Sequence, residues 1–317
     1  MSSTISGSCI AVTGGAGFIG SHLVQRLLEL GAKTVKVLDD IRLGSTSNLD
    51  LSDPRLELHT VDIGTATTGD LAPILQDTQY VFHLAAEKHN ASIGNPHRML
   101  LTNVQGTLNI LEACARQGVQ KLVFASSLYA YGRIHGEAFR EDEIAKPSTV
   151  YGISKIAGEN LVSMFSSSKI QTSTIRYLFV YGPRQWADAG YKSVIVKNFE
   201  RLVRAEQPII YGNGKQTLDY IYVSDAVDAT IRVMTDAPNG SLFNVGSGIG
   251  VQVGELLQHM LKIAESSLPI KYEAPDWTAN SYRVGDTSLI NKTLGWKPTV
   301  SLLDGLQRTY DWINARC

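Results

Sequence analysis

Two short runs of the chain hold side chains whose types and spacing suit proton chemistry on an alcohol. In Tyr151-Gly-Ile-Ser-Lys155 a phenol and an ammonium stand four positions apart, and positions four apart share one face of a helix. A positive charge beside a phenol favours the phenolate, which is a base. The pair therefore predicts a proton-accepting tyrosine, and a serine pair, Ser126-Ser127, lies upstream of it.

The second run, Thr13-Gly-Gly-Ala-Gly-Phe-Ile-Gly20, satisfies the Gly-x-Gly-x-x-Gly pattern of dinucleotide-binding turns. A turn of this kind between a strand and a helix places a pyrophosphate at the helix N-terminus. A Cβ at the close-approach glycines would collide with the pyrophosphate or keep the helix from packing on the strand. The two runs together, in this order, indicate a nicotinamide-dependent enzyme.

An acidic residue after the second expected strand selects between the two nicotinamide cofactors. Asp39 lies about 20 residues beyond the glycine run, where a carboxylate accepts hydrogen bonds from the ribose hydroxyls and repels a 2′-phosphate. This favours NAD over NADP. Asp40 is adjacent and can take the same role, Arg42 nearby leaves NADP open, and a solvated loop acid is the alternative interpretation of Asp39.

The elements that must position these residues alternate between apolar strands and amphipathic helices. Strands are expected at residues 9–13, 34–38, 56–61, 80–84, 121–125 and 172–177, with helices at 18–30, 98–117 and 150–165. This alternation predicts an α/β fold, a Rossmann-like doubly wound parallel sheet with a smaller α+β substrate lobe. We expect an NAD-binding domain of residues 1–177 plus about 216–248, and a substrate-binding lobe of about 178–215 plus 249–317.

The composition excludes several other classes of protein. The chain has 317 residues, of which 44% are hydrophobic, and a net charge of −1. Nucleic-acid and membrane-surface partners usually need a basic excess, and no apolar run approaches the roughly 20 residues of a membrane span. The first residues have no basic region before a long apolar stretch, so we expect no secretory signal. Cys9, Cys114 and Cys317 are odd in number and lack metal-ligand spacing. We expect reduced thiols, no metal and a cytoplasmic protein.

With further motifs, the chain resembles the extended short-chain dehydrogenase/reductase family, in its nucleotide-sugar epimerase and dehydratase branch. The resemblance runs nearly end to end and implies an NAD-dependent enzyme whose partner is a nucleotide sugar, with a UDP-sugar expected. The further motifs are His83-Leu-Ala-Ala86, Asn103-Val-Gln-Gly-Thr107, Tyr131-Gly132 after the serine pair, Arg176-Tyr177, Tyr181-Gly-Pro-Arg-Gln185, Asp219-Tyr-Ile-Tyr-Val223 and Phe243-Asn-Val-Gly-Ser247.

By position, the resemblance implies a role for each residue of the first run. Tyr151 would take the proton from the 4-hydroxyl of the sugar as hydride passes to NAD. Lys155 would favour the phenolate and hold the nicotinamide ribose, and Ser127 would hydrogen-bond the same sugar oxygen. The residues expected at the cofactor are Gly14, Gly17, Phe18, Ile19, Gly20, Asp39, Asp40, Asp62, Ile63, Leu84, Ala85, Ala86, Lys88, Tyr151, Lys155 and Tyr177.

The two residues after the serine pair depart from the resembled 4,6-dehydratases, which carry an Asp-Glu pair there. Leu128 cannot donate a proton, and Tyr129 stands where the base would be. Epimerases of the branch have small or inert residues at both positions, so Tyr129 is either a proton carrier or a packing ring. Glu87 and Lys88, with His89, face cofactor and sugar in this family. They are expected to restore the lost acid and base, unless Lys88 only touches the cofactor ribose.

The residues expected to bind the diphosphate of the substrate also differ from those of the family. Phe179 stands where the family places an Asn, and Leu218 where an Arg often binds the diphosphate. Arg184 and Arg283 are then the better candidates, because guanidinium groups bind phosphate oxygens bidentately, although either can be a surface charge. The expected substrate-binding residues are Ser127, Tyr129, Tyr151, Phe179, Arg184 and Arg283.

Oxidation at carbon 4 of the sugar opens several reactions. The proton-carrying groups near the sugar favour an atypical UDP-N-acetylhexosamine dehydratase, which removes water across carbons 5 and 6 as in tunicamycin-type antibiotic biosynthesis. A UDP-hexose or UDP-N-acetylhexosamine 4-epimerase is the alternative, and a non-catalytic NAD-binding sensor is a second one. By analogy with relatives, the helices at 98–117 and 150–165 are expected to pair with a second copy, giving a homodimer.

Overall fold

Seven strands of the described residues form one parallel sheet, in the order β10-β6-β5-β4-β1-β2-β3. The structure is a computed structural model that describes residues 2–89, 94–132, 136–166, 170–185, 193–275 and 278–316. The strand order reverses between β1 and β4, and sheets of this kind bind ligands beside that point. The strands are β1 (Cys9–Thr13), β2 (Thr34–Asp39), β3 (Leu56–Thr60), β4 (Tyr80–His83), β5 (Lys121–Ser127), β6 (Gln171–Tyr177) and β10 (Ser241–Val245).

The burial of these runs explains why they become central strands. Every residue of β5 is buried, and so is all of β1 after its first residue. Parallel strands with helices on both faces read as near-continuous apolar runs. The ranges predicted for the first six strands agree with the observed bounds within two residues. The predicted doubly wound α/β fold is therefore confirmed.

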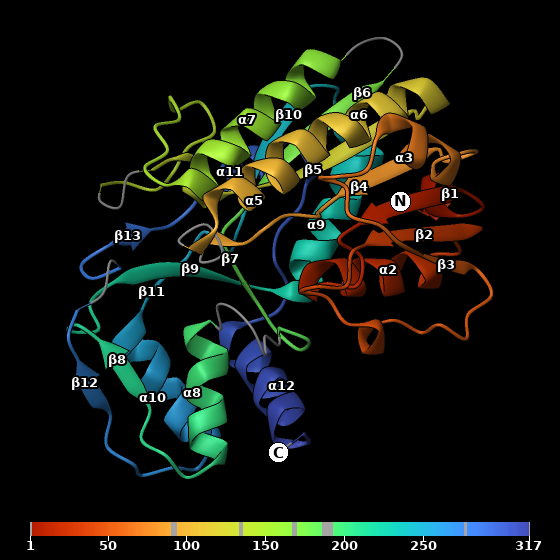
Figure 1. Ribbon diagram of the computed structural model, residues 1–317. Helices are drawn as coiled ribbons and strands as arrows, with labels where there is room; N and C mark the ends of the chain where they lie inside the picture. Colours follow the sequence, from red (N-terminus) through yellow and green to blue (C-terminus); the bar gives the residue numbers. More distant parts are fainter. Residues whose placement is uncertain are drawn as a thin grey trace.

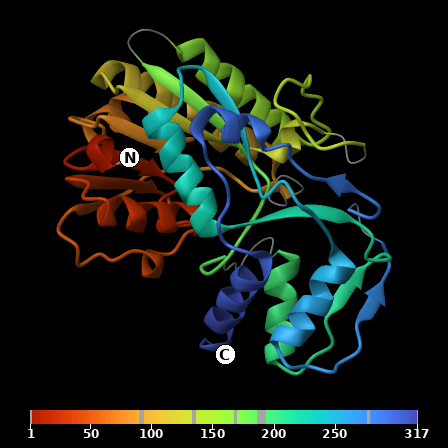
Figure 2. The ribbon, with the colours of Figure 1, turned by 180° about the vertical axis from the view of Figure 1, so that it is seen from behind.

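Helices cover both faces of the sheet (Figure 1). Figure 2 shows α2 (Phe18–Glu29) and α9 (Val223–Asp236) together on one face. The other face carries α3 (Thr68–Ile74), α6 (Gly106–Gln117) and α7 (Val150–Phe165). The shorter helices are α1 (Ser2–Ile5) and α11 (Ser288–Leu294). Among the helices described, none combines the length and the apolar character that crossing a membrane requires.

The helix predicted over residues 98–117 is interrupted in the structure. The chain forms α5 (Pro96–Leu100), then a π-helical segment, η2 (Leu101–Gln105), and then α6. Such wider turns occur often at functional sites, and η2 carries Asn103 toward the residues that follow β4. No proline interrupts residues 98–117, and the sequence therefore predicted one regular helix there.

A smaller lobe lies below the sheet in Figure 1. Its four-stranded sheet is centred on β9 (Thr217–Tyr222), which pairs with β7 (Phe179–Tyr181), β11 (Gly250–Gln252) and β13 (Tyr282–Arg283). A separate pair joins β8 (Ile209–Tyr211) to β12 (Lys271–Glu273). The helices of this lobe are α8 (Val194–Val203), α10 (Val253–Ile263) and α12 (Leu302–Asn314).

The expected domain boundary near residue 216 placed β9 in the larger domain. In the structure β9 pairs only with strands of the four-stranded sheet among the residues described, and the chain rejoins the larger sheet through α9 and β10. A buried apolar strand looks the same in either sheet, so the sequence did not distinguish them. The division into an NAD-binding domain and a nucleotide-sugar lobe stays a prediction.

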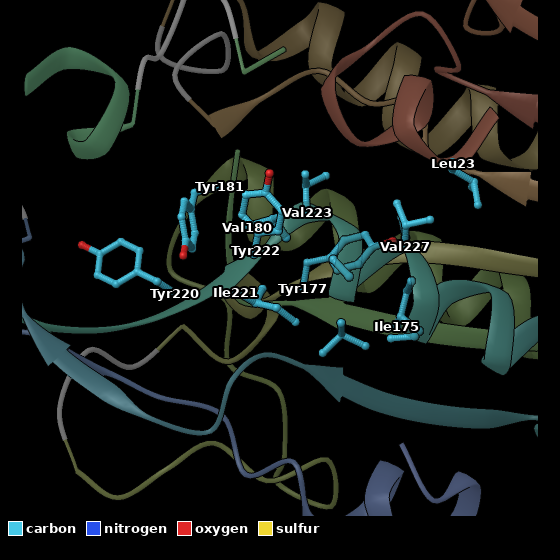
Figure 3. Packing of buried hydrophobic residues seen from close by; sticks show 14 of the residues in the cluster. Leu23, Ile175, Tyr177, Val180, Tyr181, Tyr220, Ile221, Tyr222, Val223 and Val227 are labelled. Carbon is cyan, nitrogen blue, oxygen red and sulfur yellow. The ribbon is translucent and has the colours of Figure 1, made fainter. Parts of the chain in front are cut away.

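One hydrophobic cluster joins the two parts of the molecule. It includes Leu23 of α2, Ile175 and Tyr177 of β6, and the rings of Tyr181 and Tyr220 in the small lobe. Figure 3 shows the rings of Tyr220, Tyr181 and Tyr177, which come from β9, β7 and β6, following one another from left to right. Because the cluster is shared, the cavities between sheet and lobe have rigid walls on both sides.

The cysteines lie away from any metal-like grouping. Cys9 and Cys114 carry free thiols, and Cys317 lies outside the described residues. Within the described ranges, no group of three or more His, Cys, Asp or Glu side chains is arranged to hold a metal ion.

Candidate active site

Two cavities meet at Tyr151. The glycine-loop cavity, of about 610 Å³, is lined by the turn after β1 and by the ends of β2 and β4. The aromatic cavity, of about 550 Å³, is lined by β7, α8, β9 and the short helix η3 (Leu128–Ala130). A dinucleotide in the first and a second ligand in the other would both contact the phenol. The residues that line both cavities are Phe18, Ile19, Lys88, Ser126, Tyr151, Tyr177 and Gln185.

The turn between β1 and α2 brings backbone amides to the first cavity. Gly14 has φ of +70°, and a Cβ there would lie 2.8 Å from the amide nitrogen of Ala85. A Cβ at Gly20 would collide with the carbonyl oxygen of Gly14. Gly17 precedes the first turn of α2 and provides no side-chain cap, so the first amides of the helix are left for a ligand. This arrangement suits a phosphate group.

Asp39 ends β2 with its carboxylate on the wall of the same cavity. Its oxygens accept hydrogen bonds from the amides of Ala16 at 3.0 Å and Ile41 at 2.9 Å. Burial raises the pKa of Asp39, while these two amides oppose the rise. A carboxylate has about four lone-pair sites, so both oxygens keep acceptor capacity for ribose hydroxyls.

An ion-pair cluster closes the far side of the glycine-loop cavity. Arg42 binds Asp40 at 2.8 Å and Glu87 at 2.5 Å. Arg98 of α5 binds Asp62 at 2.6 Å and lies 3.4 Å from both Asp40 and Glu87. Arg42 is therefore neutralised by its own acids, which weakens the suggestion that it binds a 2′-phosphate.

Glu87 consequently differs from its expected role. It is 4% exposed, and its carboxylate faces the two arginines in the glycine-loop cavity. It does not line the aromatic cavity. Position along the chain placed Glu87 beside the sugar, but the charge of Arg42 and Arg98 turns its side chain the other way.

The serine, tyrosine and lysine of the first motif come together where the cavities meet. The hydroxyls of Ser127 and Tyr151 are hydrogen-bonded to each other. The ammonium of Lys155 donates to the carbonyl of Ala125 at 2.8 Å and lies 5.7 Å from the centre of the Tyr151 ring. Burial raises the pKa of Tyr151 to about 12, and the Ser127 hydrogen bond opposes this. Burial also lowers the pKa of Lys155 to about 8, against the charge of Glu159.

Glu159, one turn beyond Lys155 on α7, holds the wall behind it. Its carboxylate accepts from Ser126 at 2.5 Å and from two nitrogens of Arg176 at 2.9 and 2.7 Å. The Arg176 guanidinium also lies 4.5 Å from the centre of the Tyr131 ring. This buried bidentate pair fixes α7 against β5 and β6, and thereby fixes Lys155.

Asn103 of the π-helical segment fixes the start of α7. Its amide donates to Ser154 at 3.0 Å and to the carbonyl of Glu87 at 3.2 Å, and its oxygen accepts from the amide of Glu87 at 2.7 Å. Ser154 in turn donates to the carbonyl of Tyr151 at 2.7 Å. The segment after β4 and the catalytic helix are therefore held by one side chain.

Rings dominate the wall of the aromatic cavity next to Tyr151. The ring centre of Tyr129 lies 4.8 Å from that of His89 and 5.4 Å from that of Tyr151, edge-on to the latter. The buried Arg283 guanidinium lies 5.6 Å from the Tyr129 ring centre. Phe179, the other departure, packs against Tyr220 at 6.0 Å. Burial lowers the pKa of both Lys88 and His89, which favours their neutral forms.

Arg184 lies elsewhere than expected. It lines the glycine-loop cavity and not the aromatic cavity, where its Nη2 donates to Gln25 of α2 at 2.7 Å. The Gly182-Pro183 turn directs the chain back toward α2, and this direction cannot be read from the motif. Arg184 and Arg283 are thus in different places and do not form one site.

Comparison with known proteins identifies the family. The chain matches the model of the NAD dependent epimerase/dehydratase family over residues 10–246. The chain belongs to this family. It is 32% identical over 312 residues to a putative UDP-glucose 4-epimerase of Methanocaldococcus jannaschii, a match that covers 96% of this chain and 98% of the relative.

Other relatives of this epimerase/dehydratase differ in the reaction that their names state. The dTDP-glucose 4,6-dehydratase of Streptomyces griseus is 30% identical over 312 residues, with 96% of this chain and 93% of the relative covered. The UDP-N-acetylglucosamine 4-epimerase of Methanobrevibacter ruminantium M1, solved in complex with UDP-N-acetylmuramic acid, has a TM-score of 0.92 and 30% identity, with 98% and 100% covered. The resemblance drawn from the motifs is confirmed at the level of the family. The prediction that the chain is an enzyme of this type is confirmed as well.

NAD is the cofactor of the family, and similar solved structures hold it. The glycine-loop cavity of this epimerase/dehydratase fits the group, because glycines without a Cβ line it and Asp39 faces it. The predicted NAD cofactor is confirmed. Of the residues expected to contact NAD, all except Asp62 line this cavity. The expected residues that line it are Gly14, Gly17, Phe18, Ile19, Gly20, Asp39, Asp40, Ile63, Leu84, Ala85, Ala86, Lys88, Tyr151, Lys155 and Tyr177.

Sequence reasoning missed several lining residues. In the glycine-loop cavity these come from the loop after β2 and from the end of α12, which lies far along the chain. In the aromatic cavity they are basic residues in and just after α8, Tyr211 of β8, Gln216 just before β9, and Thr278. No helix was predicted from the sequence at α8, so its basic residues were not assigned to a cavity. The missed residues are Ser45, Ser47, Asn48, Trp312 and Arg316, and Lys197, Arg201, Arg204, Tyr211, Gln216 and Thr278.

Proposed function

We propose that this chain is a UDP-sugar 4-epimerase, acting on a UDP-hexose or a UDP-N-acetylhexosamine. The observation that carries the proposal is the position of Tyr151, whose phenol stands between the two cavities, bonded to Ser127 and close to Lys155. A sugar in the aromatic cavity would present its 4-hydroxyl to this phenol. The 4-epimerases among the similar proteins support the same reaction.

The residues of the chain account for the proton steps. Tyr151 takes the proton of the 4-hydroxyl, and Ser127 hydrogen-bonds the same oxygen. NAD, when bound, accepts the hydride from carbon 4 and returns it. Because the phenolate must form next to Lys155, the ammonium lowers the cost of ionising a group whose pKa burial has raised to about 12. After the 4-ketosugar turns over, Tyr151 returns the proton to the opposite epimer.

The proposal needs one base only, and this distinguishes it from dehydration. Loss of water also requires an acid for the leaving hydroxyl and a base for the carbon-5 hydrogen. Leu128 is 4% exposed and has no proton to give, and Glu87 is held by Arg42 and Arg98. Removal and return of one proton at Tyr151 is chemistry that this site supports without a further group.

A second candidate is the 5,6-dehydratase expected from the sequence. The contact of Tyr129 with both His89 and Tyr151 favours it, because a phenol and an imidazole beside the sugar would be able to move a second proton. His89 is favoured in its neutral form by burial and by the charge of Arg283, so one ring nitrogen remains an acceptor. The sugar's carbon 5 would then have to face Tyr129.

Incubation with UDP-glucose and with UDP-N-acetylglucosamine tests these proposals. An epimerase gives a product of unchanged mass, which chromatography or proton NMR separates from the substrate as the 4-epimer. A product lighter by one water contradicts epimerisation and supports the dehydratase. No turnover of any nucleotide sugar, with NAD still bound, would leave the non-catalytic sensor.

We also propose that the chain forms a homodimer through α5 and α7. Exposed apolar side chains on these segments support it: Leu100 is 41%, Leu101 36%, Ile153 51% and Met164 68% exposed. Two helices from each copy would cover these positions. Sedimentation equilibrium at micromolar concentration is expected to give twice the chain mass, and charged residues at Ile153 and Met164 are expected to return it to the chain mass. Location in the cytoplasm stays a prediction.

A further inference from the structure

Arg184 has a backbone conformation that its side chain does not favour. Its φ is +65°, in the left-handed region that costs an ordinary residue about 1 kcal/mol relative to glycine. The turn that contains it is tied to α2, because His22 hydrogen-bonds the carbonyl of Pro183 at 2.9 Å. Strain of this kind persists where a side chain is needed at a site, which directs attention to where the guanidinium points.

The guanidinium of Arg184 is only half satisfied. Nη2 donates to Gln25 at 2.7 Å, whereas Nη1 is fully buried and has no hydrogen-bond partner. The residue lines the glycine-loop cavity together with Gly17, Phe18 and Ile19 at the start of α2. A buried donor without an acceptor is costly, so an acceptor brought to this guanidinium would be favourable.

A second cation lies near the first. Arg316, just beyond α12, lines the same cavity and stacks on Trp312, with 4.7 Å between guanidinium carbon and ring centre. Burial and the charge of Arg316 both lower the pKa of Arg184. Among the described residues no carboxylate forms an ion pair with either guanidinium, and the nearest acids of the cavity, Asp39 and Asp40, have their own partners.

We propose that Arg184 and Arg316 bind the diphosphate of the dinucleotide together with the glycine loop. The loop offers backbone amides to the cavity, and the two arginines, which follow β7 and α12 in the chain, offer guanidinium donors to the same cavity. A doubly charged diphosphate would satisfy Nη1 of Arg184 and cancel the repulsion between the cations. The small lobe would thereby hold the cofactor between turnovers.

This inference depends on NAD as the cofactor and does not depend on which sugar reacts. It also differs from the role expected from the sequence, in which Arg184 binds the diphosphate of the substrate. The aromatic cavity has its own cations in Lys197, Arg201 and Arg204 of α8. The diphosphate of NAD and the diphosphate of the substrate would then be bound by different arginines. Binding experiments with NAD and with UDP are therefore able to separate the two roles.

The test measures binding by calorimetry on full-length protein freed of cofactor, without any turnover. The ligands are NAD, ADP-ribose, adenosine and UDP, and the variants are Arg184→Gln and Arg316→Gln. For Arg184→Gln we expect the Kd of NAD and of ADP-ribose to rise about 10- to 100-fold, as for loss of a charge-assisted hydrogen bond. Arg316 is exposed, so its variant is expected to lose about 3-fold. Adenosine and UDP are expected to stay within about 2-fold in both variants.

Arg26→Gln is the matched control, because Arg26 is an exposed arginine of α2 paired with Glu29 outside the cavity. It is expected to leave all four affinities unchanged. Weakened UDP binding with unchanged NAD binding in Arg184→Gln would return Arg184 to the substrate and overturn the proposal. Equal loss for adenosine and ADP-ribose would also overturn it, since the effect would then not reside in the phosphates. If Arg184→Gln does not fold, the surface variant Arg316→Gln decides between the same outcomes.

Discussion

The glycine-loop cavity and the aromatic cavity are built in different ways. The first lies at the ends of adjacent strands β1, β2 and β4, and its shape depends on backbone atoms and on the absence of Cβ atoms. The second is assembled from β7, α8, β9 and η3, and its walls are large side chains such as Tyr129, Phe179 and Tyr220. Backbone geometry admits few residue types, whereas side-chain walls change with single substitutions. The cofactor cavity is therefore shaped by the fold, and we expect the side chains of the aromatic cavity to decide the outcome of the reaction.

The largest effect is expected where the two cavities meet. Tyr151→Phe removes the hydroxyl that takes the proton, and loss of a general base costs about 1000-fold in turnover. The ring and its contacts remain, so NAD content is expected to be unchanged. Turnover is measured with a UDP-sugar, and NAD by absorbance after denaturation. Tyr272→Phe, the same change on an exposed tyrosine of β12, is expected to match the unaltered protein; near-normal turnover in Tyr151→Phe would remove the proposed role.

The second effect concerns the wall behind the cofactor. Glu159→Gln leaves Arg176 buried without its charged partner, and breaking a buried pair in this way costs about 3 kcal/mol of unfolding free energy. Urea unfolding measures it. Arg176→Met in addition is expected to recover most of the loss, because a buried pair replaced by apolar groups is often neutral. A Glu159→Gln protein as stable as the original would show that the pair does not fix α7.

A pH effect is expected from a neutral histidine beneath the glycine loop. His83 hydrogen-bonds Thr13 at 2.6 Å and Thr107 at 2.9 Å, and burial lowers its pKa to about 3. The unfolded chain binds a proton at His83 near pH 6.5, whereas the folded chain binds it only near pH 3. The free energy of unfolding therefore falls as the pH drops from 6.5 toward 3, by up to about 1.4 kcal/mol per pH unit. Urea titrations at pH 7.5 and 5.0 check this. His83→Asn is expected to flatten the slope, and an unchanged slope would contradict the assignment.

The smallest effect is expected in the aromatic cavity itself. Tyr129→Phe keeps the ring contacts with His89 and Tyr151 and removes only the hydroxyl. If epimerisation uses Tyr151 alone, kcat is expected to change by less than about 3-fold, because a hydroxyl outside the reaction contributes little. A loss of 100-fold or more would mean that the two cavities share the acid–base work and would favour the dehydratase.

The sequence predicted the half of the molecule that depends on the backbone. Strand ranges, the helix at residues 150–165 and the glycine turn follow from apolar patterns and from glycine spacing, which act within short stretches of chain, and the resemblance supplied the other residues expected at the cofactor. The sequence did not predict the π turn at η2, because no proline marks the interruption. It also did not place β9, since a buried strand reads alike in either sheet.

The directions of long charged side chains were also not predicted. Glu87 and Arg184 are long. The resemblance placed Glu87 where it faces cofactor and sugar, and Arg184 was a candidate for the diphosphate of the substrate. Their directions are set by groups far along the chain, Arg42 and Arg98 for the first and Gln25 for the second. Charge pairing across the fold is a tertiary property, so a motif locates the Cα atom of such a residue but not the end of its side chain.

The central claim is that hydride leaves carbon 4 of the sugar and returns to carbon 4 while Tyr151 holds and returns a single proton. Turnover of UDP-glucose or UDP-N-acetylglucosamine carrying deuterium at carbon 4 tests this directly by mass spectrometry and NMR. The account predicts a 4-epimer of unchanged mass with the deuterium still on carbon 4. Loss of the deuterium to solvent, its transfer to carbon 6, or loss of water from the sugar would contradict it.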